Sequence, residues 1–527
     1  MAKTKKYKKK GKGKKVIRVM FAIIFIVTVV TAVVNYCLVS SLNKKAVSYK
    51  PVEFENQIVP VMEQGRWVFK TDRELRVMHL TDVHIGGGYM SYTRDLKAIN
   101  TVAAMITAEK PDLVIVTGDI AYPVPFQAGT FNNKSGAQVL INTLENLGVY
   151  WTVTLGNHDS EVYSYYNREK VSGFYEDESL KYCLYQPGPE DVDGKGNYVI
   201  EVKNSCDIIT QAFVMLDSHS YTDGDYFGIW WKYDNIHQNQ VDWYESEILR
   251  MNKENENIIS QLSQKGEYFD ECVPVKTLAF FHIPLVEFKE AWDELEANGF
   301  KDTDNVKYID GIIGETGKRI FSGIGEDNLF EKMVELGSTK AMFNGHDHYN
   351  NVTISRDDII FSYGYTVDYL AYIGVAEEGS QRGCTMITVK PDTTFEINKY
   401  NYYSDRYNLK GFARETVEMQ FDYEKEYGNT PIGRLVRKIV GVDRGAVNEA
   451  FSEFLTEERL NLNQMRFVNL IVDYIVANGN IDDNRVLMEE PFRSVGSITT
   501  LFKNDMGTAK RIMEVVADIK RNSEEIA

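Results

Sequence analysis

The chain has 527 residues, 43% of them apolar and 12% aromatic, so its composition permits a large core and about two to four domains. Its formal net charge is −17, but residues 1–18 carry +10, and subtracting this leaves −27 for the rest. So acidic a body is a poor general nucleic-acid binder, because contacts to phosphates need an excess of lysine and arginine, and we expect no nucleic-acid partner. The five cysteines form no CxxC or close pair, which argues against a cysteine metal site and a disulfide framework.

The first element is an apolar segment directly after the basic N-terminus. Residues 19–42 contain no charged side chain, and about 20 apolar residues suffice to cross a bilayer as a helix. A cleavable signal usually has an apolar core of only ~7–15 residues. We therefore interpret residues 19–42 as an uncleaved transmembrane signal anchor, with cleavage near Ser41 or a buried core helix as alternatives. The positive-inside rule predicts that residues 1–18 are cytoplasmic.

Residues 43–72 are then expected to be a stalk, and three strand–helix units follow it. Apolar strands are predicted at 75–80, 113–116 and 150–155, and helices at 93–109 and 136–147. Helices that alternate with strands indicate parallel pairing of those strands. Each predicted strand ends at a polar cluster, which is where open α/β sheets carry their sites.

Seven further strands are predicted along the chain, and the spacing of the later ones, without helices between them, suggests an antiparallel portion. These strands cover residues 209–216, 275–281, 340–343, 351–355, 359–362, 384–389 and 394–399. Residues 160–205 and 217–245 are rich in Tyr, Asp, Gly and Trp, and we expect them to be long loops overhanging the site. Residues 298–325 are expected to form an irregular insertion.

Five short clusters along the chain contain candidate metal ligands. They are Asp82-Val83-His84, Gly118-Asp119, Gly156-Asn157-His158-Asp159, His282 and Gly345-His346-Asp347-His348. Carboxylate, imidazole and amide oxygen together suit divalent ions such as Mn, Fe and Zn. Two such ions roughly 3.5–4 Å apart can clamp a phosphoryl group and generate a hydroxide between them. One histidine alone is more often structural, but five of them in matched clusters favour a metal site.

These clusters, in this order, resemble those of calcineurin-like metallophosphoesterases, and the text around His282 and His346 resembles the purple-acid-phosphatase-like branch. The resemblance covers roughly residues 73–400 and sets the expected catalytic domain at 73–405. It implies an α/β fold with a two-sheet sandwich flanked by helices. It also implies hydrolysis of phosphate mono- or diesters by a metal-bound hydroxide at two divalent ions. The expected ligands are Asp82, His84 and His348 for one ion, Asn157, His282 and His346 for the other, and Asp119 as the bridge.

The same resemblance suggests roles for residues that are not ligands. His158 resembles the catalytic imidazole that stabilises the phosphoryl oxygens or protonates the leaving group, and Asp159 is expected to orient it. His219 follows a predicted strand and is a candidate substrate-binding residue. Tyr122 matches the tyrosine that ligates Fe(III) in purple acid phosphatases. Those enzymes have no histidine equivalent to His84, so we expect that Tyr122 is not a ligand and that the protein is not purple.

The last hundred residues have a different character. After a linker at 406–424, residues 425–527 show helical periodicity and few strand signals. The text Pro431-Ile432-Gly433-Arg434-Leu435-Val436 and Asn448-Glu449-Ala450-Phe451 is similar to the C-terminal helical domain of type I restriction enzyme R subunits. This resemblance implies a docking module for a protein partner. The chain has no GxxxxGK[ST] loop, so no motor activity is implied. Whether the segment is functional or a fusion passenger is left open.

Together these features predict a single-pass plasma-membrane phosphoesterase with an extracellular catalytic domain. The competing class is a binding protein that uses the phosphoesterase fold as a scaffold. Lost ligands would be the sign of such a scaffold, and none of the expected seven is missing. The motifs do not separate monoester, diester, nucleotide, lipid head-group and phosphoprotein substrates.

Overall fold

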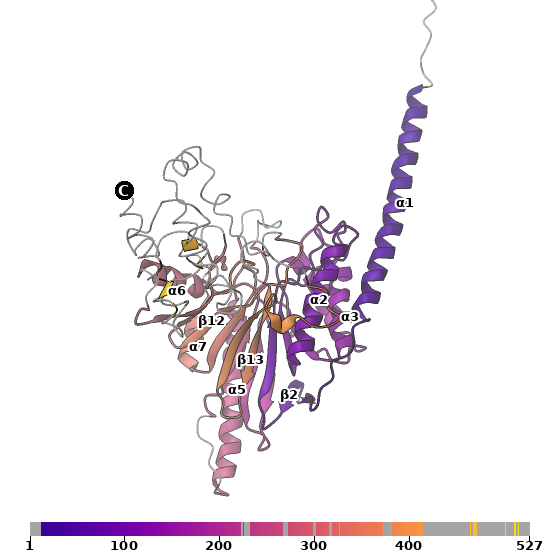
Figure 1. Ribbon diagram of the computed structural model, residues 1–527. Helices are drawn as coiled ribbons and strands as arrows, with labels where there is room; N and C mark the ends of the chain where they lie inside the picture. Colours follow the sequence, from indigo (N-terminus) through magenta and orange to yellow (C-terminus); the bar gives the residue numbers. More distant parts are fainter. Residues whose placement is uncertain are drawn as a thin grey trace, which may run out of the picture.

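The chain folds into two facing β-sheets covered by helices, with one long helix leaving the body (Figure 1). The computed structural model describes residues 12–222, 225, 232–266, 272–298, 302–315, 319–325, 327–372, 375 and 382–414, and isolated positions between 464 and 515. This arrangement confirms the predicted α/β two-sheet sandwich.

The first sheet has five strands in the order β14-β13-β3-β4-β5. Its strands are β3 (Leu75–Leu80), β4 (Leu113–Thr117), β5 (Tyr150–Thr154), β13 (Gly383–Val389) and β14 (Phe395–Asn401), and its helices are α2 (Tyr92–Glu109) and α3 (Asn133–Leu147). β3, β4 and β5 pair in parallel, as predicted, because α2 and α3 return the chain to the starting edge each time. α3 ends at Gly148, whose φ of 71° gives the left-handed turn that stops a helix.

The second sheet has nine strands in the order β1-β2-β6-β7-β8-β10-β12-β11-β9. These strands are β1 (Val61–Glu63), β2 (Arg66–Lys70), β6 (Tyr198–Lys203), β7 (Ile209–Met215), β8 (Thr277–Phe280), β9 (Val306–Asp310), β10 (Thr339–Asn344), β11 (Thr353–Arg356) and β12 (Ile359–Tyr363). The remaining helices are α4 (Arg168–Tyr175), α5 (Gln238–Ser263), α6 (Val286–Ala297) and α7 (Leu329–Leu336). β11 pairs antiparallel with β9 and β12, and β13 with β14, so the predicted antiparallel portion is present among the later strands. The earlier strands β7, β8 and β10 pair in parallel, with α5, α6 and α7 between them.

Alternate residues of the central strands face two different cores. In β8, Leu278 and Phe280 join the core between the sheets, while Ala279 joins the core beneath α5, α6 and α7. A strand buried on both faces reads as a continuous apolar run, which is why these strands are visible in the sequence.

Several elements depart from the sequence-based expectation. Residues 66–70, within the expected stalk, form β2 and pair in parallel with β6. β6 itself lies inside the expected loop 160–205, and β9 lies inside the expected insertion 298–325. Each of these strands is short, and the pairing of β2 with β6 and of β9 with β11 joins segments distant in sequence, which a local pattern does not reveal.

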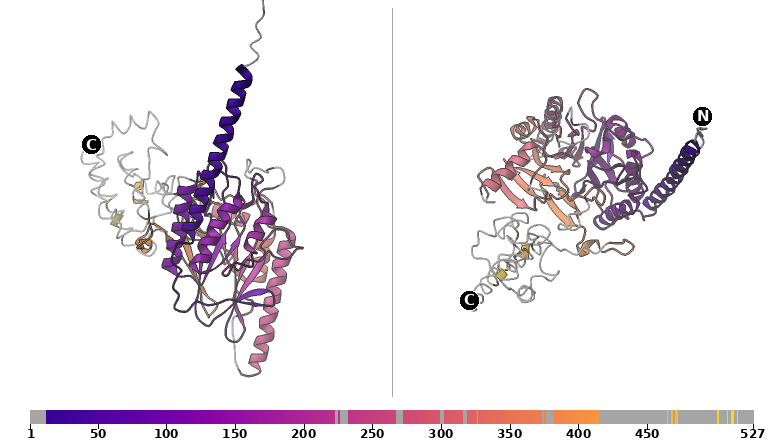
Figure 2. Two further views of the ribbon diagram at one scale, coloured as in Figure 1. Left: turned by 90° about the vertical axis from the view of Figure 1, so that its right-hand side faces the viewer. Right: turned by 90° about the horizontal axis from the view of Figure 1, so that it is seen from above.

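The helix α1 (Lys12–Ala46) leaves the body at one side of the first sheet (Figure 2). Its portion Arg18–Ala46 is long and apolar enough to cross a membrane, and its most apolar stretch is exposed. Near its end, Leu42 and Ala46 are buried in the core of the first sheet. The helix is therefore continuous with the folded domain.

The first part of the expected linker also packs on this domain. Phe412 stacks on Tyr49 with ring centroids 5.8 Å apart. Residues 415–424 and, apart from isolated positions, the expected helical domain 425–527 lie outside the described residues, as does the basic segment 1–11.

Candidate metal centre

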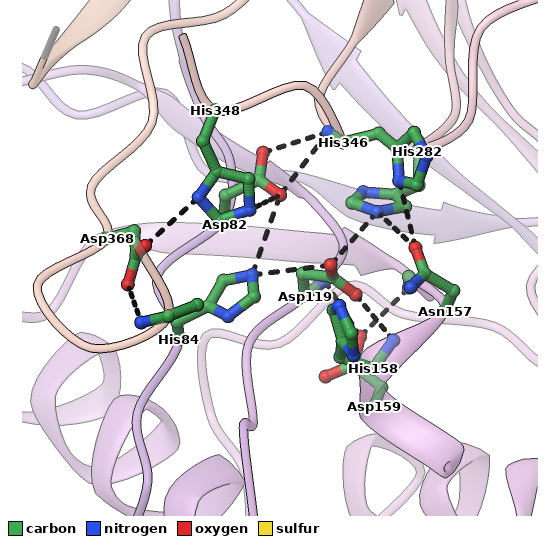
Figure 3. Close-up of polar contacts among 12 residues, drawn as sticks. Asp82, His84, Asp119, Asn157, His158, Asp159, His282, His346, His348 and Asp368 are labelled. Carbon is green, nitrogen blue, oxygen red and sulfur yellow. Dashed lines mark hydrogen bonds and ion pairs between the residues drawn. The ribbon is translucent and has the colours of Figure 1, made fainter. Parts of the chain in front are cut away.

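The expected ligands gather where the carboxyl ends of five parallel strands meet (Figure 3). β3, β4 and β5 of the first sheet end just before Asp82, Asp119 and Asn157 respectively, and β8 and β10 of the second sheet end just before His282 and His346. The two sheets thus contribute to one site from opposite sides. All seven expected ligands are brought together and buried, although they span 267 positions, from 82 to 348.

The backbone at this edge is held in unusual conformations. Asp82, His84, Asp119 and His346 all have positive φ, at 51°, 48°, 51° and 80°. Such values are uncommon for residues other than glycine and cluster at functional sites. Gly118 also has a positive φ, and a Cβ there would lie 2.5 Å from the nitrogen of Gly156. The strand ends therefore approach too closely for a side chain at that position.

One group of four ligand atoms surrounds a common point. Atoms of Asp82, His84, Asp119 and His348 all lie within 4.8 Å of one another. Nε2 of His348 is 3.4 Å from Oδ1 of Asp82, and Nε2 of His84 is 3.3 Å from Oδ2 of Asp119. This group corresponds to the set expected for the first ion together with the bridging carboxylate.

A second group lies on the other side of Asp119. Oδ1 of Asn157 is 3.1 Å from Nε2 of His282 and 3.0 Å from Nδ1 of His346. Nε2 of His282 is also 3.2 Å from Oδ2 of Asp119. One carboxylate oxygen therefore faces ring nitrogens of both groups, which is the position a bridging ligand requires.

Two atoms at the centre support occupation by metal. Neither Nε2 of His84 nor Oδ2 of Asp119 makes a hydrogen bond within the described part of the chain, although both atoms are buried. Buried polar atoms in native proteins are nearly always satisfied, so an unsatisfied pair facing each other calls for a bound partner. The nitrogen and oxygen donors fit divalent ions of the Mn, Fe and Zn type.

Contacts behind the ligands fix the orientation of their rings. Nδ1 of His282 is 2.8 Å from the carbonyl oxygen of Thr117, and Nδ1 of His348 is 3.1 Å from Oδ2 of Asp368. In each ring the other nitrogen is thereby directed at the centre, as is usual for metal-binding histidines. Asp368 was not foreseen from the sequence, because nothing in its local pattern separates it from other acidic loop residues.

Asp159 does not orient His158, contrary to expectation. Its carboxylate instead accepts four backbone hydrogen bonds of 2.9–3.0 Å, from Asp119, Ile120, Ala121 and Gly156. A carboxylate one residue after a histidine points away from that ring here, because the short helical turn His158–Ser160 carries successive side chains in different directions. Asp159 therefore ties the end of β4 to the end of β5.

Glu161 takes the role that the sequence suggested for Asp159. Its Oε1 lies 2.6 Å from Nδ1 of His158, three residues along the same turn. Burial disfavours a charged imidazole, but Asp119 and the hydrogen bond with Glu161 outweigh it and raise the pKa of His158. The sequence could have indicated this contact, because residues three apart on a helical turn lie next to each other.

His158 is the most accessible of the expected site residues. Its side chain is 23% exposed, whereas those of His84 and His282 are fully buried. Its backbone N–H donates to Oδ1 of Asp119 over 2.8 Å, which fixes the residue beside the bridging carboxylate. A protonated ring at the mouth of the centre is suited to donate a proton to a substrate oxygen.

Described residues of the expected loop 217–245 lie beside the centre, whereas residues 238–245 belong to α5 and do not form a loop. The hydroxyl of Tyr221 lies 3.0 Å from Nδ2 of Asn157 and 3.2 Å from Oε1 of Glu161. The ring of Tyr233 meets the ring of His346 edge to face at 4.2 Å. These two tyrosines pair with each other, so they form a wall beside the second group of ligands.

The candidate substrate residue His219 is engaged elsewhere. Its Nε2 lies 2.8 Å from Oε1 of Gln240, and its ring stacks on His237 at 4.1 Å. These contacts attach it to the start of α5. They give no support for direct contact with a substrate.

A partly buried arginine fixes the loop that carries Asn157 and His158. Arg168 pairs with Asp217 through Nε over 2.8 Å and donates to the carbonyl oxygens of Leu155 and Gly156, each over 3.0 Å. The arginine thus holds the two residues that immediately precede Asn157. Its role is positional, since it acts through the backbone of the loop.

Tyr122 lies beside the first group of ligands. Its ring centroid is 4.7 Å from that of His84 and 5.0 Å from that of His158. Tyr122 is therefore close to the centre. That it does not ligate a metal stays a prediction.

Comparison with known proteins agrees with this site. The model of the calcineurin-like phosphoesterase family matches residues 75–350, just over half of the chain, and the model named EcoEI R protein C-terminal matches residues 406–524. The protein named probable inactive purple acid phosphatase 14 of Arabidopsis thaliana is 27% identical over 325 residues, which cover 58% of this chain and 73% of that protein. Probable inactive purple acid phosphatase 28 of the same plant is 25% identical over 326 residues, with the same coverage.

Among solved structures, a dimetal phosphatase from Danio rerio is similar over 63% of this chain and all of its own, with 12% identity and a TM-score of 0.38. The family match itself spans all five ligand clusters. The chain therefore belongs to the calcineurin-like phosphoesterase family and is a metallophosphoesterase.

Proposed function

We propose that this protein is a binuclear metal-dependent phosphoesterase that hydrolyses phosphate mono- or diesters from a membrane anchor, with its catalytic domain outside the plasma membrane. The observation that carries the proposal is the position of Asp119. Its Oδ2 lies 3.3 Å from Nε2 of His84 and 3.2 Å from Nε2 of His282. A shared carboxylate reduces the repulsion between two dications held this close together.

The seven ligands would hold two ions, of which Mn, Fe and Zn best match the donor set. When bound, such ions supply Lewis-acid activation of the phosphoryl group and of the attacking water. The chain itself supplies His158, whose pKa is raised by Asp119 and Glu161 against the effect of burial. The protonated ring would donate to the departing ester oxygen, with Glu161 keeping its Nδ1 side occupied.

The anchor proposal rests on α1. Its exposed apolar stretch follows a lysine-rich segment without acidic residues. By the positive-inside rule, the basic side stays cytoplasmic and the catalytic domain lies outside. We further propose that residues 425–527 dock a protein partner and take no part in the reaction.

Hydrolysis by the full-length protein in detergent tests the enzyme. The substrates are p-nitrophenyl phosphate and bis-p-nitrophenyl phosphate, each with Mn, Zn, Fe or Mg, beside an Asp119→Asn variant. We expect metal-dependent turnover that this variant loses by about 10³-fold or more, because both ion sites share the carboxylate. The preferred substrate would assign the monoester or diester class.

Both plant relatives are named as probable inactive purple acid phosphatases, so a scaffold without activity is the second candidate. Metal analysis separates the two candidates. A folded protein that binds no metal and turns over neither substrate would favour the scaffold. A folded protein that binds two ions without turning over either ester would exclude these simple esters as substrates.

A further inference from the structure

The direction of α1 relative to the metal centre can be read from its contacts. Oδ1 of Asn43 accepts a hydrogen bond from Asn142 over 2.7 Å, and the carbonyl oxygen of Tyr49 accepts one from Asn146 over 2.7 Å. Both partners lie in α3, which starts after β4 and ends before β5. α3 therefore runs from the carboxyl edge of the sheet to its amino edge, and the end of α1 runs alongside it in the same direction.

The earlier residues of α1 must then project past the carboxyl edge. The hydroxyl of Ser41 lies 2.9 Å from that of Tyr92, the first residue of α2, and Oδ1 of Asn35 accepts from the N–H of Tyr89 over 3.0 Å. Tyr89 lies in the loop that begins with Asp82 and His84. Residues 19–34 continue beyond this contact for about 24 Å at 1.5 Å per residue, close to the thickness of a hydrocarbon core. Figures 1 and 2 show the helix rising from that end of the domain.

A membrane crossed by α1 would thus lie against the edge that carries the metal ligands. This edge also presents exposed apolar side chains, which we call the apolar rim. The rim consists of Tyr89, Met90, Phe126, Phe131, Val162 and Tyr165. Phe126 is 87% exposed and Tyr165 is 66% exposed, values that are unfavourable for aromatic side chains in water.

The apolar rim is formed by the loops after β3, β4 and β5, which are connected by backbone hydrogen bonds. The N–H of Met90 donates to the carbonyl oxygen of Ala128 over 3.1 Å, which ties the first loop to the second. The N–H of Tyr165 donates to the carbonyl oxygen of Phe131 over 3.0 Å, which ties the third loop to the second. The same three loops carry Asp82, Asp119 and Asn157, so the rim and the metal centre are parts of one surface.

We propose that the apolar rim inserts into the interface of the bilayer that α1 crosses, and that the substrate is a phosphate ester of a lipid alcohol in that bilayer. This inference rests on the proposed function and assigns its substrate class. Aromatic and aliphatic side chains beside a membrane helix are suited to the head-group boundary. A water-soluble ester would gain nothing from such a rim, whereas a lipid head group leaving the bilayer would pass directly to the centre.

The reaction on such a substrate is an ordinary hydrolysis. The oxygen of water bonds to phosphorus while the bond from phosphorus to the lipid oxygen breaks. The lipid oxygen takes the proton of His158 and remains in the bilayer as an alcohol. The proton lost by water leaves with the phosphate product or with solvent.

The first test uses the full-length protein reconstituted in phosphatidylcholine vesicles that contain phosphatidic acid. Release of phosphate is compared with turnover of glycerol phosphate and of p-nitrophenyl phosphate by the same vesicles. In a Met90→Ser/Phe126→Ser/Tyr165→Ser variant, we expect the rate of phosphate release from the vesicle lipid to fall about tenfold or more, while the rate of p-nitrophenyl phosphate turnover is unchanged. The matched control is Val59→Ser, which removes a 60% exposed apolar side chain near Gln57, whose amide contacts Gly148 at the amino edge.

A second measurement does not depend on which lipid is hydrolysed. Phe126→Trp and Val59→Trp variants are reconstituted with brominated phosphatidylcholine, and the quenching is compared with that of the unaltered chain. Additional quenching at position 126 but not at position 59 is expected. Equal quenching at the two positions, or equal loss of lipid and soluble activity in the triple variant, would overturn the inference. A folded chain that binds no metal and turns over neither p-nitrophenyl phosphate nor bis-p-nitrophenyl phosphate would instead refute the proposed function.

Discussion

Nδ1 of His158 lies 2.6 Å from Oε1 of Glu161, so a buried carboxylate supports the most accessible histidine of the metal centre. The pair lies on one short turn directly after β5. It leaves the other ring nitrogen of His158 available to a substrate. The pKa of this histidine is therefore raised both by Asp119, from the loop after β4, and by Glu161 in its own loop.

Glu161→Gln is expected to lower the pKa of His158, because the carboxylate that favours its charged form is removed. If His158 acts as the acid, the alkaline limb of the kcat profile moves to lower pH. At neutral pH we expect kcat to fall about 10–100-fold. Metal content should stay at the unaltered level, since Glu161 is not among the expected ligands. An unchanged pH profile together with a lower rate would assign Glu161 a purely structural role.

Metal binding should become tighter as pH rises through the neutral range. Burial of His84 and His282 disfavours the charged form of each ring. Neighbouring carboxylates outweigh this effect and raise the pKa of His84 to about 10 and that of His282 to about 9 in the metal-free protein. Both rings are then protonated at neutral pH and must lose a proton to bind an ion. For each ring that must release a proton, the affinity for the metal rises about tenfold for every unit by which the pH increases, as long as the pH is below the pKa of that ring. Titration of the metal-free protein, prepared with a chelator, with Zn²⁺ in weak buffer should release protons. If no protons were released, the two histidines would not be protonated before the metal binds.

Breaking the buried pair of Arg168 and Asp217 should destabilise the catalytic domain. Arg168→Met leaves the Asp217 carboxylate buried without its partner, at a cost of about 3–5 kcal/mol. The double variant Arg168→Met/Asp217→Asn should be less destabilised than the single one, because no uncompensated charge remains. Thermal denaturation of the solubilised full chain measures the difference. As a control, Lys289→Met breaks an exposed pair on α6 and should shift Tm little.

Iron-loaded protein is expected to lack the charge-transfer colour of purple acid phosphatases. His84 faces Asp82 and Asp119 within the first group of ligands, while Tyr122 packs against the side of the His84 ring. The visible spectrum of the iron-loaded protein checks this. A visible band that disappears in a Tyr122→Phe variant would make Tyr122 a ligand.

Removal of residues 425–527 should leave phosphoesterase activity intact. The seven expected ligands and the residues that support them all lie between positions 82 and 368. Turnover of p-nitrophenyl phosphate by a chain ending at residue 424 tests this expectation. Loss of both folding and activity would mean that the C-terminal segment is required by the catalytic domain.

The sequence by itself determined the elements with strong local patterns and the ligands that follow them. β3, β4 and β5 are mostly apolar because both faces of their sheet are buried, and each ends at a polar cluster. The apolar segment of α1 is equally evident in the sequence. By contrast, the parallel pairing of β2 with β6 joins segments about 130 residues apart, and no local pattern reveals it, although β6 also pairs with the neighbouring β7.

Tertiary structure alone decided which neighbours support the site. Asp159 and Glu161 are both acidic residues close to His158 in sequence, yet only Glu161 contacts its ring, because the turn directs Asp159 to the backbone of the β4 loop. Asp368 reaches His348 from a loop after β12, a contact that only the folding of the second sheet creates. Residue types at a given spacing indicate which chemistry is possible, whereas the direction of each side chain depends on the backbone that carries it.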